Sequence, residues 1–287
     1  MPIISANSLP IYYEAYGAGE TVVYLQSPLG GINPGAYYFA GRLSARFRVL
    51  IWDSPNTGRT GVSLRKTPSE WQLCCQYLKE LLDALGESAV HLAGCSGGGE
   101  MGLLFAHLYP DRVQSLAMYR PTDSASSAEQ ELFRTRYFNL AEIARTSSVA
   151  EAVEYSKAPP PSRFSGVSRW LWEIYEKDRD ALLAFQGGDL AELLNDWGKW
   201  ASSPLFYRAN LSDAELRAIT VPTLLCPCAD EYHPKRLAVD LHEHLPNAAI
   251  IPSARVRSEV EIYNSLEKHP FGGFTDFVNE YEKFHLS

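Results

Sequence analysis

The sequence predicts an α/β protein with a mostly parallel sheet flanked by helices and interrupted by an inserted helical segment. Strand-like and helix-like segments alternate over residues 21–118, and the alternation resumes over residues 223–251. Residues 122–215, in contrast, contain helical patterns and no convincing strand. Such alternation is typical of parallel sheets with right-handed crossovers. We therefore expect a core domain made of residues 1–121 and 216–287, with residues 122–215 as a helical cap.

The length and composition fit one α/β domain with a sizeable insertion. A chain of 287 residues with 46% apolar content can bury a full core. Its formal net charge of −8 repels phosphate backbones, so we expect no nucleic-acid partner. No apolar run approaches the ~20 residues that span a bilayer, and the start Met1–Ser5 lacks the pattern of a secretory signal. We expect a cytoplasmic protein without a membrane partner.

Short apolar runs and capping signals define the predicted elements. The strand-like runs of the first half are residues 21–25, 47–52, 89–93 and 113–118. The clearest helix begins after Ser69, which forms an S-x-x-Q capping box with Gln72, and it ends before Gly86. Apolar residues between these positions recur at steps of three or four, which predicts one buried helix face. After the cap, the predicted elements are a strand over 223–228, a helix over 235–245, a strand over 248–251 and a final helix through 274–284.

The strongest functional signal is a glycine-rich turn, Gly94–Gly98 with the sequence GCSGG, between a predicted strand and a predicted helix. A serine hydroxyl is a poor nucleophile and needs exposure, a base and donors for an oxyanion. A sharp strand-to-helix turn exposes the serine, and its close backbone contacts require glycine two positions before and after it. We expect Ser96 to be the nucleophile, with the Gly97 N–H as an oxyanion donor. A turn that merely connects two elements is the alternative, and a P-loop is excluded because no lysine follows the glycines.

With this turn in this context, the chain resembles the α/β-hydrolase superfamily, in particular its esterases, lactonases and epoxide hydrolases. The resemblance covers the whole chain except residues 122–215, which match the variable cap of that family. It implies a hydrolase that uses a Ser-His-Asp triad and an acyl-enzyme, with no cofactor and no metal.

The resemblance also implies an acid and a base. The acid of the family usually follows a late strand, and the stretch 221–230 (VPTLLCPCAD) places Asp230 there. A helix cap is the other interpretation of Asp230, and Asp123, after the strand before the cap, ranks second as the acid. The base of the family normally lies between the last strand and the last helix, where this chain has His269. His233, close to Asp230 in the chain, is the rival base.

The second oxyanion donor is an open point. In the family it comes from a loop after an early strand that usually reads His-Gly-x, and here Gln26 and Ser27 occupy the first two positions. Pro28 then falls on the donor position, although proline has no N–H. The Leu29 N–H can turn inward, the Gln26 or Ser27 side chain can substitute, or the site keeps one donor.

Aromatic residues of the cap suggest the substrate class. Because the cap roofs the active site in this family, we expect Trp170, Trp197, Trp200 and Tyr137 to line an apolar pocket. Core packing of the cap is the alternative role for these rings. The sequence thus predicts hydrolysis of a small hydrophobic carboxylic ester or lactone. The alternatives are a non-hydrolytic lyase or cyclase, suggested by Pro28 and by Arg255 near the usual place of the base, and a ligand receptor that uses the same pocket.

Overall fold

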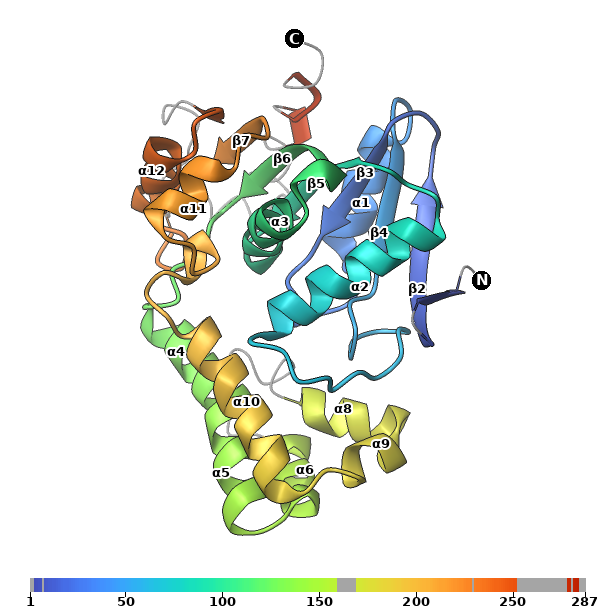
Figure 1. The fold of residues 1–287 in the computed structure, drawn as a ribbon, viewed down its shortest axis with the longest axis vertical. Helices are drawn as coiled ribbons and strands as arrows, with labels where there is room; N and C mark the ends of the chain where they lie inside the picture. The colour runs from blue at the N-terminus through green and yellow to red at the C-terminus, as the bar shows by residue number, and fades with distance from the viewer. Residues whose placement is uncertain are drawn as a thin grey trace.

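The fold was analysed in a computed structural model, which describes residues 3–6, 8–158, 169–228, 230–251, 278–279 and 281–283. One eight-stranded sheet, in the order β1-β2-β4-β3-β5-β6-β7-β8, runs through these residues (Figure 1). The strands are β1 (Ile3–Ala6), β2 (Leu9–Tyr16), β3 (Thr21–Leu25), β4 (Arg48–Trp52), β5 (Val90–Cys95), β6 (Val113–Tyr119), β7 (Thr223–Cys226) and β8 (Ala248–Ile250).

The sheet is mostly parallel, as predicted. Strands β3 to β8 pair in parallel, whereas β2 runs antiparallel to both β1 and β4. The antiparallel edge formed by β1 and β2 is additional to the predicted segments. The predicted strand-like runs of the first half correspond to β3, β4, β5 and β6. The predicted α/β class is therefore confirmed.

Helices cover both faces of the sheet because each central strand is apolar on both sides. Along β3, Val22 and Tyr24 pack in one buried cluster, whereas Val23 and Leu25 pack in the other. This period of two places alternate side chains on opposite faces. The core helices are α1 (Pro34–Leu43) on the face of Val22, and α2 (Glu70–Ala84), α3 (Gly97–Leu108) and α12 (Lys235–His244) on the face of Val23.

Local signals set the ends of these helices. The Ser69 hydroxyl accepts a hydrogen bond from the Gln72 N–H at 3.0 Å and so caps α2, as the capping box predicts. Just after α2, Gly86 has a φ of +73°, a left-handed conformation that favours glycine. A short 3₁₀ turn, η1 (Pro110–Arg112), leads from α3 into β6.

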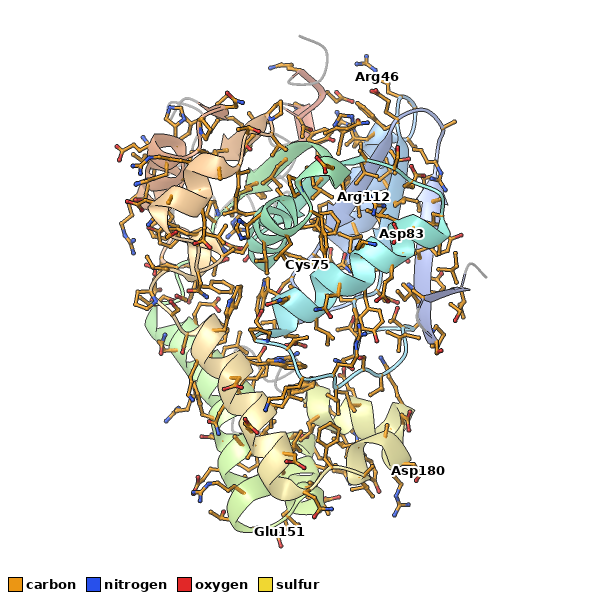
Figure 2. The ribbon with its side chains drawn as sticks, in the orientation of Figure 1. Arg46, Cys75, Asp83, Arg112, Glu151 and Asp180 are labelled. Atoms are coloured by element: carbon orange, nitrogen blue, oxygen red, sulfur yellow. The ribbon has the colours of Figure 1, made fainter. Side chains whose placement is uncertain are left out.

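Helices α2 and α3 pack against each other. Figure 2 labels Cys75 of α2, and its Sγ lies 3.5 Å from the carbonyl oxygen of Met101 on α3.

Between β6 and β7 the chain forms a helical insertion, residues 122–215, whose described residues contain no strand. Figure 1 shows most of it as a separate lobe at one end of the molecule, and Figure 2 shows Glu151 and Asp180 at its outer side. Its helices are α4 (Ser127–Phe133), the π-helical turn η2 (Arg134–Phe138), α5 (Asn139–Thr146), α6 (Val149–Lys157), α8 (Trp170–Lys177), α9 (Arg179–Leu183), α10 (Gly187–Ala201) and the 3₁₀ turn η3 (Phe206–Arg208). Helix α11 (Asp213–Ala218) leads back to β7. Among the described residues, no helix combines the length and apolar character needed to cross a bilayer.

A buried ion pair joins the insertion to the core. Arg136 of η2 donates to both carboxylate oxygens of Glu70 on α2, at 2.9 and 3.2 Å, and both side chains are fully buried. The Tyr137 hydroxyl donates to the same carboxylate at 2.5 Å. The Trp170 ring lies 4.5 Å from the Arg136 guanidinium and covers it. We call Glu70, Arg136 and Tyr137 the junction cluster, because they link α2 to the helical insertion.

Candidate active site

Ser96 occupies a strained turn between β5 and α3. Its φ of +52° and ψ of −132° are unfavourable for a residue with a Cβ. A Cβ at Gly94 would overlap the carbonyl oxygen of Gly98, and a Cβ at Gly98 would overlap that of Leu25. Glycine is therefore required at both positions, for the steric reason that the sequence suggests. Although Ser96 stands at the N-cap of α3, its hydroxyl does not bond the first turn.

The loop after β7 brings a histidine to this serine. The Nε2 atom of His233 lies 3.1 Å from Ser96 Oγ, and its Nδ1 lies 2.7 Å from Asp230 Oδ1. The same Asp230 oxygen accepts backbone N–H bonds from Tyr232 at 3.0 Å and from His233 at 2.9 Å. The carboxylate is thus held by the backbone of its own loop. Thr122, just after β6, approaches from the other side, with its Oγ1 2.9 Å from Ser96 Oγ.

Arg120 completes the surroundings of the acid. Its Nη2 pairs with Asp230 Oδ2 and also lies 3.0 Å from His233 Nδ1. The Cys228 thiol donates to Asp230 Oδ2 at 3.4 Å. Burial alone would raise the pKa of Asp230, but the hydrogen bond with His233 and the positive charge of Arg120 hold this pKa below its usual range. Asp230 is therefore ionised at neutral pH.

His233 is suited to accept a proton. Burial lowers the pKa of its imidazole, the hydrogen bond to Asp230 offsets part of this, and the positive charge of Arg120 lowers the pKa further. The ring is therefore neutral at pH 7. When Nδ1–H donates to Asp230, Nε2 carries a lone pair that faces the Ser96 hydroxyl.

Only one of the two other acid and base candidates falls within the described residues. His269 is outside the described residues. Asp123 forms an ion pair with Arg236 of α12 and accepts the Ala125 N–H at 3.0 Å. Of the acids considered, the structure thus brings Asp230 next to His233, and through it to Ser96.

In the loop after β3, the Gln26 side chain and the N–H groups of Leu29 and Gly30 donate hydrogen bonds to protein oxygen atoms. The Leu29 N–H donates to Ser27 Oγ at 3.3 Å, and the Gly30 N–H donates to the Ser27 carbonyl at 3.1 Å. Gln26 donates through Nε2 to the Trp52 carbonyl. A Cβ built on Gly97 would lie 2.7 Å from Ser27 Oγ, so this hydroxyl faces the residue that follows Ser96.

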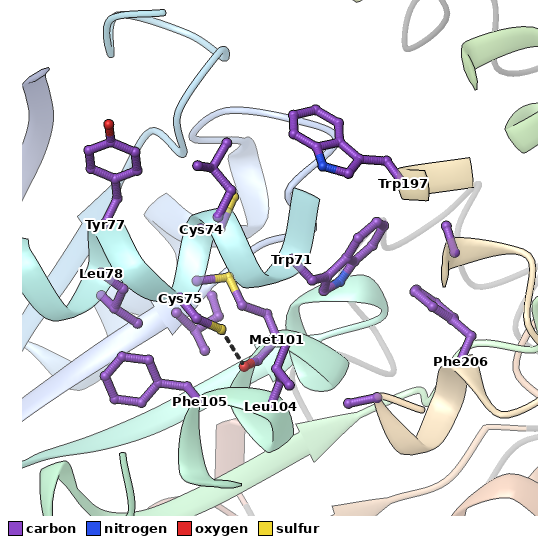
Figure 3. Packing of buried hydrophobic residues seen from close by; sticks show 14 of the residues in the cluster. Trp71, Cys74, Cys75, Tyr77, Leu78, Met101, Leu104, Phe105, Trp197 and Phe206 are labelled. Atoms are coloured by element: carbon purple, nitrogen blue, oxygen red, sulfur yellow. Dashed lines mark hydrogen bonds between the residues drawn. The ribbon is translucent and has the colours of Figure 1, made fainter. Parts of the chain in front are cut away.

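A cavity of about 240 Å³ opens beside Ser96, Gly97 and Thr122. The core and the helical insertion both contribute apolar walls. These walls include Leu29 and Trp71 from the core and Leu132, Phe133 and Phe206 from the insertion. Figure 3 shows Trp71 of α2 near Phe206 of the insertion, and their ring centroids are 4.9 Å apart in an edge-to-face arrangement.

The four aromatic residues expected at the pocket are not among the described residues that line this cavity. Trp170 and Tyr137 are buried in and around the junction cluster. Trp197 is buried and donates through Nε1 to the Thr67 carbonyl at 3.0 Å, and Trp200 stacks on Trp71 with centroids 5.4 Å apart. Helical spacing shows which face of a helix is buried, but not which element that face packs against. Here the predicted residues pack mostly where the insertion meets the core.

Two residues of this site, Arg120 and Thr122, are absent from the sequence-based predictions. Arg120 directly follows β6 and Thr122 comes two residues later, and β6 pairs in parallel with β5, the strand that leads to Ser96. The carboxyl ends of neighbouring parallel strands meet at one edge of a sheet, where α/β proteins commonly bind ligands. Their position just after a predicted strand was therefore a usable signal.

Comparisons with known proteins agree with this architecture. The sequence model described as alpha/beta hydrolase fold matches residues 29–146. The chain is 30% identical over 257 residues to the "Putative carbamate hydrolase RutD" of Azorhizobium caulinodans, with 87% of this chain and 88% of the relative covered. It is 35% identical over 119 residues to a 2-hydroxy-6-oxononadienedioate/2-hydroxy-6-oxononatrienedioate hydrolase of Paraburkholderia phymatum, which covers 39% of this chain and 40% of that protein.

A solved structure shares the fold over its full length. The enol-lactonase from Burkholderia xenovorans superposes with a TM-score of 0.60 and 17% identity, and all of both chains is covered. The family match, the extended sequence identity and the shared fold together show that this chain belongs to the α/β-hydrolase family, a family of hydrolases.

Proposed function

We propose that this chain is a serine hydrolase that cleaves a small hydrophobic carboxylic ester or lactone, with Ser96 as nucleophile, His233 as base and Asp230 as acid. One observation carries the proposal. Ser96 Oγ, on a strained turn beside a cavity, lies 3.1 Å from the Nε2 of a histidine whose Nδ1 contacts a carboxylate at 2.7 Å. This is the arrangement that activates a serine hydroxyl.

Each residue has a defined part in the proposed reaction. Ser96 Oγ bonds to the substrate carbonyl carbon while its proton passes to His233 Nε2. The Gly97 N–H, at the start of α3, stabilises the negative oxygen that forms. The imidazolium of His233 then protonates the departing alkoxide oxygen, which leaves an acyl group on Ser96. Water releases this acyl group by the same steps in reverse order, and Asp230 holds and stabilises the imidazolium throughout.

The cavity favours a compact apolar acyl group. Its volume of about 240 Å³ is below the ~300–1,000 Å³ that is usual for small-molecule sites. Because Leu132, Phe133 and Phe206 of the helical insertion form part of its wall, we propose that residues 122–215 act as a cap over the substrate. A carbamate is the second candidate substrate, since a relative that matches 87% of this chain is named a putative carbamate hydrolase.

Fluorophosphonate labelling with peptide mapping tests this proposal. The expected label is on Ser96, and Ser96→Ala is expected to lower kcat/KM for 4-nitrophenyl butyrate by about 10⁴-fold or more with unchanged folding. Ser63→Ala is the control, because it removes a buried serine hydroxyl that bonds Tyr77 rather than lining the cavity. Butyryl esters are expected to react faster than acetyl or long-chain esters, and a matched carbamate tests the second candidate. Turnover of Ser96→Ala within about tenfold of the parent, or a label on another residue, would refute the assignment.

A further inference from the structure

The oxyanion site has a gap in its backbone donors. The developing negative charge is normally met by two hydrogen-bond donors. The Gly97 N–H can provide one. Pro28, in the loop after β3, falls on the position that the resemblance to the α/β-hydrolase family assigns to the second donor, and proline carries no N–H.

The neighbouring donors of this loop are already engaged. The Leu29 N–H donates to Ser27 Oγ at 3.3 Å and closes a tight turn together with the Gly30 N–H. Gln26 is buried, and its amide donates to the carbonyl of Trp52. The donor for an oxyanion must therefore be sought in another group of the same loop.

The Ser27 hydroxyl meets the requirements. A hydroxyl that accepts one hydrogen bond, here from Leu29, still has its proton to donate, and the accepted bond polarises it in the favourable direction. Ser27 lines the cavity together with Ser96, and its Oγ faces Gly97. We propose that Ser27 is a catalytic residue whose hydroxyl replaces the missing backbone donor and binds the oxyanion opposite the Gly97 N–H. This inference rests on the proposed serine-hydrolase function.

Gly97 provides an independent argument. Its φ lies outside the left-handed region, so the backbone does not itself demand glycine there. A Cβ on Gly97 would instead come within 2.7 Å of Ser27 Oγ and 3.1 Å of Ser27 Cβ. Trp71 Nε1 donates to the Gly97 carbonyl at 2.7 Å, which fixes the position of this residue. Glycine at 97 thus leaves room for the Ser27 side chain beside the nucleophile.

The decisive experiment separates transition-state binding from ground-state binding. Ser27→Ala is expected to lower kcat/KM for 4-nitrophenyl butyrate by about 10²- to 10³-fold, mainly through kcat, with KM within about threefold. A trifluoromethyl ketone tests the same contact without turnover, because Ser96 Oγ adds to its carbonyl carbon, the serine proton passes to His233 and the carbonyl oxygen becomes negative. Its inhibition constant is expected to rise by the same factor as kcat/KM falls.

Ser27→Gly and Gly97→Ala make a matched double-mutant cycle. Gly97→Ala is expected to lower kcat/KM about as much as Ser27→Gly, because the new Cβ displaces the hydroxyl. Ser27→Gly removes Ser27 Oγ and Cβ, the two Ser27 atoms that a Cβ at position 97 would meet. In a Ser27→Gly background, Gly97→Ala is therefore expected to lower kcat/KM little further. Strictly additive losses, a Ser27→Ala enzyme within about threefold of the parent, or an unchanged inhibition constant would each overturn the inference. If Ser96→Ala keeps its activity, the proposed function itself fails, which distinguishes the two failures.

Discussion

Two carboxylate–arginine pairs in this molecule, one fully buried and one partly exposed, have different surroundings. In the junction cluster, Glu70 and Arg136 are fully buried, and aromatic rings cover them. In the site beside β5, the side chains of Asp230 and Arg120 keep 17% and 24% of their exposure. The first pair is closed off between the core and the insertion, whereas the second lies next to a serine and a cavity.

The difference shows that placement decides what such a pair can do. Burial and the charge of Glu70 raise the pKa of Tyr137 well above its usual value, so this hydroxyl remains a donor at any ordinary pH. The junction cluster therefore links two parts of the fold. Asp230, in contrast, is hydrogen-bonded to the neutral imidazole of His233, whose Nε2 faces Ser96. Similar residue types thus give a structural link in one place and a proton-transfer unit in the other.

The largest effect is expected from variants that remove His233 or Asp230 from the site beside Ser96. His233→Ala and Asp230→Asn are each expected to lower kcat/KM by about 10³-fold or more, because both act as one unit with Ser96. His269→Ala is the matched comparison and is expected to be mild. Steady-state kinetics on 4-nitrophenyl butyrate decide between the two histidines. An inactive His269→Ala beside an active His233→Ala would move the base to His269.

Breaking the junction cluster is expected to affect stability rather than chemistry. Arg136→Met leaves the Glu70 carboxylate buried without its cation, which typically costs about 3–5 kcal/mol of unfolding free energy. Denaturant titration measures this loss. Arg145→Met is the control, since its exposed pair with Glu142 is expected to contribute only about 0–1 kcal/mol. Equal stabilities of the two variants would contradict a structural role for the cluster.

The smallest effect concerns the pH dependence of the proposed base. Because the pKa of His233 is lowered, the acid limb of kcat/KM is expected below the ordinary histidine value of about 6.5. Arg120→Gln removes a positive charge beside the imidazole, so protonation becomes easier and the limb moves to higher pH by about half a unit or more. Arg236→Gln is the control, because Arg236 pairs with Asp123 instead. A limb that stays in place in Arg120→Gln would show that the charge of Arg120 does not act on His233.

The sequence by itself determined the parallel strands, the capped helix α2 and the turn at Ser96. The capping of α2 by Ser69 and the need for glycine at 94 depend on contacts within a few residues, which can be read along the chain. Glycine at 98 makes room for the carbonyl of the distant Leu25, but it belongs to a turn pattern that is recognisable in the sequence. The α/β class is predictable for the same reason, because its strands and helices alternate in order.

The tertiary structure alone decided which side chains meet at the nucleophile. Ser96 and His233 are 137 positions apart in the sequence. They meet because Ser96 follows β5 and His233 follows β7, and only β6 lies between these two strands in the sheet. It also decided that Trp71, Phe133 and Phe206 line the cavity while Trp197 packs in the junction. Periodicity reveals that a residue is buried, but the element that buries it depends on how distant segments pack. The Ser27 hydroxyl reaches Gly97 by the same long-range packing, between the ends of two neighbouring parallel strands.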